Sequence, residues 1–287
     1  MLLQRIITAL ILVPLVGLAV FLLPIEYFSL LIGLITLLAA WEWTRLIGID
    51  SPVKRGLFLL ALILPMLWLH LWTQFLELAA QVLDWPDVRD YSGALEWLVI
   101  APVLFWVLAM ILIRNTPQGV LKLNLRIRYK ALIGLLVLVA TWLFLSRLRA
   151  FYGSEMTLYF LVLIWAADIA AYFVGKKYGK TKLAPEISPG KTVQGMYGAL
   201  IAGGICAVAL TLIYGFPWMI AADFVLLSLL TVLISIYGDL FFSVVKRQRG
   251  VKDTGSLLPG HGGILDRIDS LIAAVPFFYA GIILIHP

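Results

Sequence analysis

Nine long runs of apolar residues constrain what this chain can fold into. They occupy residues 6–23, 27–46, 56–73, 95–113, 131–149, 157–175, 194–214, 220–242 and 270–285. A helix needs about 20 apolar residues to cross a bilayer, and in lipid only a helix satisfies its backbone groups within one segment. Only 13% of the 287 residues are charged, about half the share in a typical soluble domain. The sequence therefore predicts an all-α polytopic integral membrane protein with about nine transmembrane helices.

The basic residues indicate how these helices are oriented. If the N-terminus is cytoplasmic and the runs alternate in direction, 19 of the 22 Lys and Arg residues lie in cytoplasmic segments. Only Arg89, Arg147 and Arg149 fall on the other side, where the loop after the third run is acidic. This asymmetry is what the positive-inside rule describes, and it predicts a cytoplasmic N-terminus and a C-terminus outside. The net charge of +6 thus reflects topology and gives no indication of nucleic-acid binding.

The two halves of the chain differ in chemical content. Residues 1–150 hold about five spans with few polar groups, typical of a scaffold that gives lipids access. Residues 151–287 carry most of the chemistry and are predicted to be the catalytic region, with cytoplasmic loops at 175–193 and 243–269. The first run could also be a signal peptide, but it continues beyond its small residues and many spans follow, which favours a retained helix. The single cysteine, Cys206, excludes a disulfide within the chain.

Two acidic residues lie within or beside predicted spans. Glu42 is part of the segment Trp41–Arg45 at the end of the second span, where it could pair with Arg45, three residues on. We interpret this segment as an interfacial belt with a snorkelling arginine rather than as part of a catalytic site. Asp168 lies in the middle of the sixth span, where an acid must face a partner or a wet cavity. Structural pairing and a role in the site are both open for it.

A short turn precedes the seventh span. It reads Ser188-Pro189-Gly190-Lys191-Thr192, and Ser188 could cap the helix that follows. The helix N-terminus and Lys191 would then form an anion site, although a basic loop that merely obeys topology is the alternative. The letters GKT suggest a phosphate-binding P-loop, but Pro185 stands where that motif needs glycine and no strand is predicted before it. We reject the P-loop.

The stretch from Asp239 to Asp269 concentrates the charge of the second half. Asp239, Ser243 and Lys246 are spaced to share one helical face, and Asp266 and Asp269 share a face at the start of the last helix. Between them lies a glycine-rich loop whose backbone can approach a ligand closely. A solvated cytoplasmic loop would explain the basic residues, but not the three acids at helix ends.

These residue types favour phosphoryl-transfer chemistry. Carboxylates brought together repel each other unless a cation lies between them, and hard oxygen ligands select Mg²⁺ or Ca²⁺ over Zn²⁺. Mg²⁺ typically takes one or two carboxylates and completes its shell with water and substrate phosphates. Positive side chains that would hold phosphates follow in the same stretch: Lys246, Arg247, Lys252 and Arg267. The sequence therefore predicts a metal-assisted phosphate site at the membrane surface.

The same stretch resembles a known family signature. The matching positions are Ser243, Lys246-Arg247, Lys252-Asp253, Gly255, Leu258-Pro259, His261-Gly262-Gly263 and Asp266-Arg267-Ile268-Asp269. They resemble the phosphatidate cytidylyltransferases, or CDP-diacylglycerol synthases, and most closely the bacterial type. The resemblance extends to Trp41-Glu42-Trp43, Asp168, residues 182–185 and residues 188–192. One departure is Val193, where that family usually has tryptophan, which puts a packing contact in doubt.

The resemblance implies a reaction in which CTP and phosphatidate give CDP-diacylglycerol and pyrophosphate. It also implies Mg²⁺, with K⁺ beside it, and a homodimer in the bacterial inner membrane with its site facing the cytoplasm. Asp239 and Asp266 would be the metal-binding pair, supported by Asp269. With Lys246 they make up the expected catalytic group. The expected substrate-binding residues are Ser188, Lys191, Thr192, Ser243, Arg247, Lys252, His261 and Arg267.

Two other functions remain to be weighed. An ion-coupled transporter would carry charge deep in paired, broken helices, whereas here the charge gathers at one membrane face and only Asp168 is deep. Another lipid phosphotransferase class, the CDP-alcohol phosphotransferases, is disfavoured because its DG…AR…G…D…D pattern is absent from this sequence.

Overall fold

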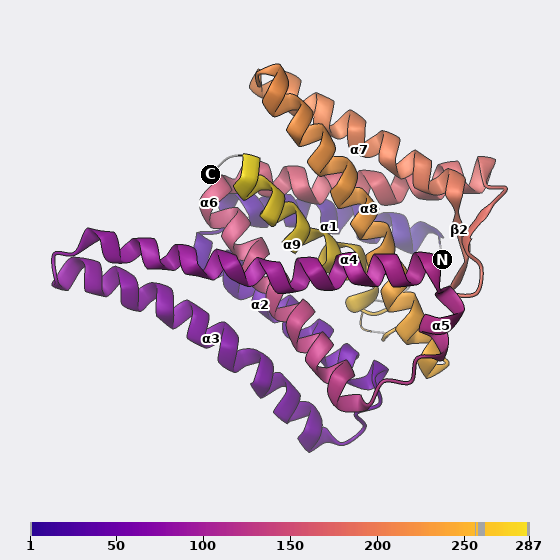
Figure 1. The fold of residues 1–287 in the computed structure, drawn as a ribbon, viewed down its shortest axis with the longest axis horizontal. Helices are drawn as coiled ribbons and strands as arrows, with labels where there is room; N and C mark the ends of the chain where they lie inside the picture. Colours follow the sequence, from indigo (N-terminus) through magenta and orange to yellow (C-terminus); the bar gives the residue numbers. More distant parts are fainter. Residues whose placement is uncertain (1, 256, 258–261, 286–287) are drawn as a thin grey trace.

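The fold is a bundle of long helices with one small hairpin of strands (Figure 1). It is described from a computed structural model that covers residues 2–255, 257 and 262–285, without the side chains of residues 2–11 and 86–92. The elements in order are α1 (Leu2–Leu22), α2 (Ile25–Leu46), α3 (Pro52–Val82), the 3₁₀ segment η1 (Pro86–Val99), α4 (Ile100–Asn115), α5 (Pro117–Lys122), α6 (Ile127–Tyr178), β1 (Lys182–Ala184), β2 (Ser188–Thr192), α7 (Val193–Tyr214), α8 (Trp218–Arg249) and α9 (Leu265–Ile285).

The prediction of an all-α polytopic membrane protein is confirmed at the level of fold class. Within the described residues, seven helical segments are long and apolar enough to cross a membrane. The predicted spans at 131–149 and 157–175 both lie in α6, which is 52 residues long and is interrupted at Gly153, where φ is +80°. The halves of α6 on either side of this glycine run in different directions (Figure 1).

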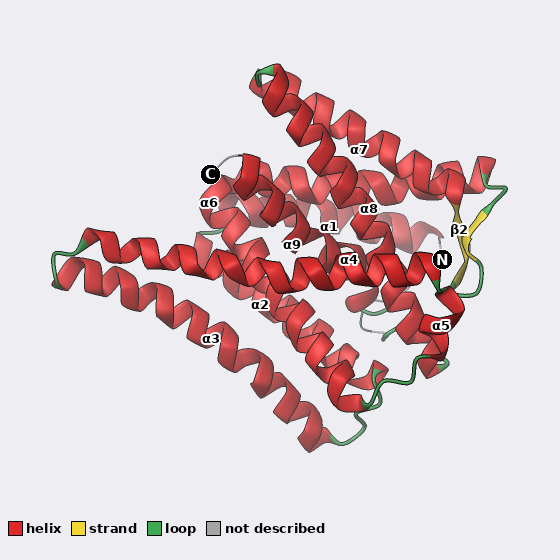
Figure 2. Ribbon diagram, viewed as in Figure 1, coloured by secondary structure: helices red, strands yellow, loops and turns green. Residues whose placement is uncertain are grey.

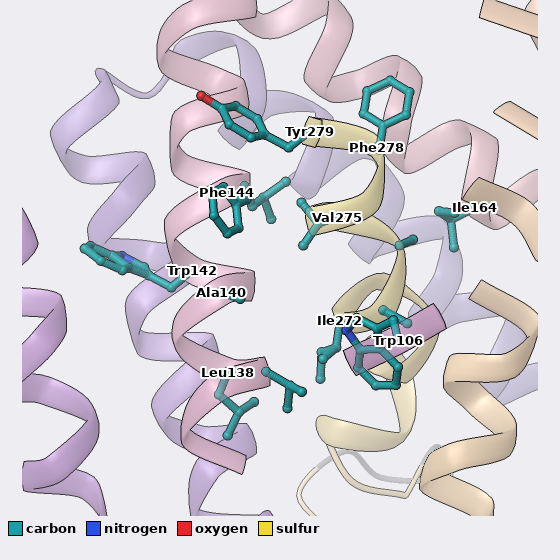
Figure 3. Close-up of a cluster of buried hydrophobic side chains, with 14 of the residues drawn as sticks. Trp106, Leu138, Ala140, Trp142, Phe144, Ile164, Ile272, Val275, Phe278 and Tyr279 are labelled. Atoms are coloured by element: carbon teal, nitrogen blue, oxygen red, sulfur yellow. The ribbon is translucent and has the colours of Figure 1, made fainter. Parts of the chain in front are cut away.

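The core forms where α6 packs against α9. Phe144 and Leu138 of α6 face Ile272 and Val275 of α9 (Figure 3), and all four side chains are buried. The second half of α6 adds Phe160, whose ring lies 5.2 Å from that of Phe278. Burying aromatic and branched side chains on both sides of α9 fixes the helix that begins with the predicted acids Asp266 and Asp269.

A tryptophan holds α2 against the first half of α6. The Trp43 indole N–H donates to the carbonyl oxygen of Lys130 at 3.2 Å, and its ring stacks on Phe241 of α8. A side chain at Gly134 would place its Cβ 2.0 Å from the Trp43 indole nitrogen, so glycine is required there. This contact holds the C-terminal end of α2, including Glu42, beside α8 and α9.

The loop between α6 and α7 contains the fold's antiparallel β1–β2 hairpin (Figure 2), which pairs Lys182 with Thr192. The expected turn at 188–192 is therefore an extended strand. The prediction that Ser188 caps α7 is wrong. Thr192 is the capping residue instead, and its hydroxyl accepts a hydrogen bond from the Gly195 N–H at 3.1 Å. A cap directly before the first helical residue is where an oxygen can reach the unpaired amides.

Helix α8 extends further than its apolar run indicates. The run ends at residue 242, whereas α8 continues to Arg249 and ends in a left-handed Gly250. Asp239 was expected at the end of this span, but it lies ten residues before the helix ends. The helix therefore carries Asp239, Ser243 and Lys246 together in its C-terminal third. The C-terminal end of α8 lies beside α5 (Figure 1).

Candidate active site

Two lysine–aspartate pairs link α8 to its neighbours β2 and α9. Lys191 of β2 places its Nζ 2.7 Å from Asp239 Oδ2 and donates to the carbonyl oxygen of Ile236 at 3.1 Å. Lys246 places its Nζ 2.8 Å from Asp266 Oδ1 on α9. The hairpin explains the first pair, since a strand that ends directly at α7 directs residue 191 towards α8. The second pair forms because α8 packs against α9, which places Lys246, two turns beyond residue 239, beside Asp266.

The expected face of α8 is confirmed. The Ser243 hydroxyl donates to Asp239 Oδ1 at 3.3 Å, as the spacing of four residues predicts. Both oxygens of Asp239 therefore accept hydrogen bonds from protein groups, one from Ser243 and the other from Lys191.

The Asp266 carboxylate accepts hydrogen bonds from both ends of the glycine-rich loop. Its Oδ2 accepts from the Thr254 N–H at 2.8 Å, from the Thr254 hydroxyl at 3.1 Å and from the Gly263 N–H at 3.1 Å. Gly262, with φ of +83°, adopts the left-handed conformation that brings this backbone over the carboxylate. With Lys246 on the other oxygen, Asp266 lies within hydrogen-bond distance of four donor groups, which fixes its position.

Asp168 and Asp269 join the same cluster. Asp269 is buried, its Oδ1 accepts from the Ser270 N–H at 2.8 Å, and its charge interacts with Asp168, Asp239 and both lysines. Asp168 has an exposed side chain, and its charge interacts with Lys191 and Asp239. Of the two roles left open for Asp168, membership of this charge cluster is therefore the one the geometry favours. These three carboxyl groups therefore lie within electrostatic reach of one another, together with the ammonium groups of Lys191 and Lys246 and the guanidinium of Arg267.

Glu42 is the residue that sequence reasoning missed. It is only 2% exposed and bonds to Thr254, Ile264 and Leu265, so the interpretation of its segment as a simple interfacial belt is wrong for this side chain. Its pairing with Arg45 is not among the ion pairs of the described residues. The available signal was an acid beside two tryptophans at the end of an apolar helix, which marks an ionised group needing a partner.

The remaining predicted substrate-binding residues have varied positions. Arg247 donates from its Nε to the carbonyl oxygen of Ile187 at 3.1 Å, which ties α8 to the turn of the hairpin. Thr192 is buried as the cap of α7, and Ser188 is half-buried in β2. Lys252 and Arg267 are exposed, and Arg267 lies within electrostatic reach of Asp168. The prediction for His261 falls outside the described residues.

Val193, the departure from the family pattern, begins α7 beside the site. It lines a cavity of about 330 Å³ with Leu183, Met196 and Tyr237 among others. A tryptophan at this position would project towards that space, so the smaller residue leaves it open.

The donor set allows a hard divalent cation without forming a closed cage. Within the described residues, no three Asp, Glu, His or Cys side chains converge closely enough to hold one metal ion. The oxygens of Asp239 and Asp266 that face the lysines could turn to a cation if the ammonium groups moved aside. Such partial ligation fits Mg²⁺, which keeps water and substrate oxygens in its shell.

Helices long and apolar enough to cross a membrane, together with the cluster of acids and lysines, indicate a membrane protein with a charged site. Comparison with known proteins gives its family. A model of the cytidylyltransferase family matches residues 3–285, so the chain belongs to that family. It is 36% identical to the phosphatidate cytidylyltransferase of Haemophilus influenzae, over 97% of both chains, and 40% identical to that of Pseudomonas aeruginosa, over 98% of this chain and 96% of the relative. A Bacillus subtilis phosphatidate cytidylyltransferase is 45% identical over 131 residues, or 45% of this chain and 47% of the relative.

Proposed function

We propose that this protein transfers the cytidylyl group of CTP to phosphatidate. The supporting observation is the cluster of Asp239, Asp266, Lys191 and Lys246, at one end of the helices of a chain that belongs to the cytidylyltransferase family over nearly its whole length. An oxygen of the phosphatidate phosphate attacks the α-phosphorus of CTP. The bond from that phosphorus to the bridging oxygen breaks, so that CDP-diacylglycerol forms and pyrophosphate leaves. No enzyme nucleophile is needed because the lipid phosphate supplies the attacking oxygen.

The residues of the cluster suit this reaction because the two substrates are both polyanions. Lys191 contacts Asp239 on the face of α8 that also carries Lys246, and each ammonium group is already held by a carboxylate. Phosphate oxygens that compete for these ammonium groups would be neutralised where the reacting atoms meet. Fixed charges that stabilise the developing negative charge, and that hold both reactants close, are the main sources of rate in such transfers.

We propose Mg²⁺ as the cofactor, with K⁺ as the second ion that the family resemblance implies. Asp239 and Asp266 would hold it, with Asp269 supporting them through its charge. When bound, the ion would neutralise phosphate oxygens as charge develops on the leaving pyrophosphate. The gathering of Asp239, Asp266 and Asp269 close to the two lysines supports a divalent cation there.

We also propose nine crossings, with the N-terminus in the cytoplasm and the C-terminus outside. At 1.5 Å per residue, the 52 residues of α6 would extend about 78 Å, far beyond the roughly 30 Å of a bilayer core, so its halves would cross separately. With α1, whose described apolar part spans Leu12–Leu22, this gives nine. The bacterial relatives support the inner membrane, and the basic residues around the site support a cytoplasmic orientation. Light scattering in detergent would test the homodimer that the resemblance implies.

The decisive experiment is transfer of label from radioactive CTP to a lipid-soluble product, in detergent with phosphatidate and Mg²⁺. Asp266→Asn should abolish the transfer because the neutral amide cannot balance Lys246 or a cation. Asp223→Asn is the matched control, since Asp223 is an exposed acid at the opposite end of α8. Failure of the unaltered protein to label lipid would refute the proposed reaction and leave the transporter as the better candidate. Full activity of folded Asp266→Asn would refute the assignment of this acid.

A further inference from the structure

Glu42 contacts both sides of the glycine-rich loop from a helix in the other half of the chain. Its Oε1 accepts from the Ile264 N–H at 3.0 Å, and its Oε2 accepts from the Leu265 N–H at 2.8 Å. Both amides belong to the start of α9, where the first N–H groups of a helix have no partner within the helix. A carboxylate at this end is favoured by the helix dipole as well. Glu42 therefore caps α9 from a position 222 and 223 residues earlier in the sequence.

The same carboxylate reaches the loop at Thr254. The Thr254 hydroxyl lies 2.9 Å from Glu42 Oε2 and 3.1 Å from Asp266 Oδ2. One hydroxyl proton can serve only one of these oxygens at a time, so the hydroxyl stands between two acids. The backbone N–H of Thr254 donates a hydrogen bond to Asp266 Oδ2. The two carboxylates together thus bind amides on both sides of the loop, at Thr254 and at Gly263–Leu265.

Two glycines of the loop are explained by Glu42 rather than by a ligand. A Cβ at Gly255 would lie 2.5 Å from Glu42 Oε1, and its three nearest atoms would all belong to Glu42. A Cβ at Gly263 would lie 2.2 Å from Thr254 Oγ1 and 2.3 Å from Glu42 Oε2, the two atoms of one Glu42–Thr254 hydrogen bond. Neither glycine has the positive φ found at Gly262. The close backbone approach expected from the glycine density is therefore, at these two positions, an approach to the buried acid.

We propose that Glu42 is a positioning residue for the cytidylyl transfer. It touches no residue of the Lys191–Asp239 pair, and it acts through Thr254 and the start of α9 on Asp266. By fixing these groups it holds the Asp266 carboxylate at Lys246, and so sets the distance between the acids of α8 and α9. This inference rests on the proposed function, because the consequence of misplacing Asp266 is measured as lost transfer.

The chemistry of the site requires a carboxylate of this length. In Glu42→Gln one carboxylate oxygen becomes an NH₂ group, which would face a backbone N–H of Ile264 or Leu265 with no acceptor between them. In Glu42→Asp the charge remains, but the shorter side chain cannot reach Thr254 and both amides together. In the glutamine variant the loop should therefore no longer be held in place. In the aspartate variant part of the ordering of the loop should remain.

The first experiment measures turnover and local protection in the same full-length proteins. For Glu42→Gln we expect kcat to fall about tenfold to a hundredfold, because small displacements of reacting groups have effects of that order, while KM for phosphatidate changes less than twofold. Hydrogen exchange should accelerate in the peptide covering residues 262–266 and stay unchanged in α6. Glu26→Gln, an exposed acid at the start of the same helix, is the control and should match the unaltered protein. A glutamine variant with normal kcat and normal exchange would overturn the inference.

The second experiment tests the contact with Gly255. Gly255→Ala should lower transfer at least about tenfold because its methyl group displaces Glu42, whereas in a Glu42→Ala background the same change should have less than a twofold effect. Equal effects in the two backgrounds would overturn the assigned contact. If the unaltered protein transfers no label at all, the proposed function fails, and the exchange measurement still decides whether Glu42 holds the loop.

Discussion

Lys246 offers the sharpest test of how the site is stabilised. Its ion pair with Asp266 is largely removed from solvent, with side-chain exposures of 12% and 6%. In Lys246→Met, a residue of similar shape leaves Asp266 charged and without its cation. Removing one partner of a buried pair costs about 3–5 kcal/mol. Asp266 keeps three other donors, from Thr254 and Gly263, so we expect the lower end of that range, about 3 kcal/mol.

A double variant separates the cost of the orphaned charge from the value of the pair. In Lys246→Met with Asp266→Asn, the asparagine oxygen can still accept from the Thr254 and Gly263 amides, and its NH₂ group faces no ammonium. This variant should recover at least about 2 kcal/mol of the loss and yet transfer no label. The matched comparison is Lys191→Met, whose pair with Asp239 is more exposed, at 24% and 31%, and should cost about 1 kcal/mol or less.

The assay is equilibrium unfolding in mixed micelles with a denaturing detergent, followed by helical circular dichroism. The reasoning would be refuted if Lys246→Met were as stable as the unaltered protein. It would also be refuted if the double variant were as unstable as the single one, because the loss would then arise from packing of the lysine stem and not from the unpaired carboxylate.

Two further predictions concern the helix contacts that support the site. Gly134→Ala forces a methyl group to within 2.0 Å of the Trp43 indole nitrogen, so we expect a loss of at least about 2 kcal/mol and lower yield of folded protein, measured by size-exclusion chromatography; an unchanged profile would contradict the contact. Thr192→Val removes the cap that accepts from the Gly195 N–H and should cost about 1 kcal/mol in the same unfolding assay, whereas Thr192→Ser should restore it; equal stability of the two variants would show that the hydroxyl is not the stabilising group.

Much of the fold and part of the site follow from the sequence because both depend on local spacing. Apolar runs of about 20 residues predict helices, and the intervals between Asp239, Ser243 and Lys246 predict their shared face. The start of the last helix at Asp266 was also predictable from the return of apolar residues after a glycine-rich loop.

Other features depend on contacts between segments far apart in the chain and could not be predicted from local sequence patterns. Arg247 fits a phosphate ligand by type, yet its Nε bonds to the turn of the hairpin. Ser188 and Thr192 are both good capping residues, and only the pairing of β1 with β2 decides that the strand continues to residue 192. At Gly153 the helix bends without an intervening loop, so two predicted spans are joined within α6. Glu42 acquires its role only when α2 meets α9.

The cap that α2 supplies to α9 has a consequence for biosynthesis. The ribosome makes α2 well before α9, so a nascent chain that has inserted α2 through α8 already contains Asp239 and Lys246 but lacks Asp266 and the amides that Glu42 binds. The two ends of the site therefore meet only when α9 enters the bundle. Insertion of α9 is in this way the step that assembles the charge cluster, and a nascent chain without it carries Asp239 and Lys246 without the arrangement that the reaction requires.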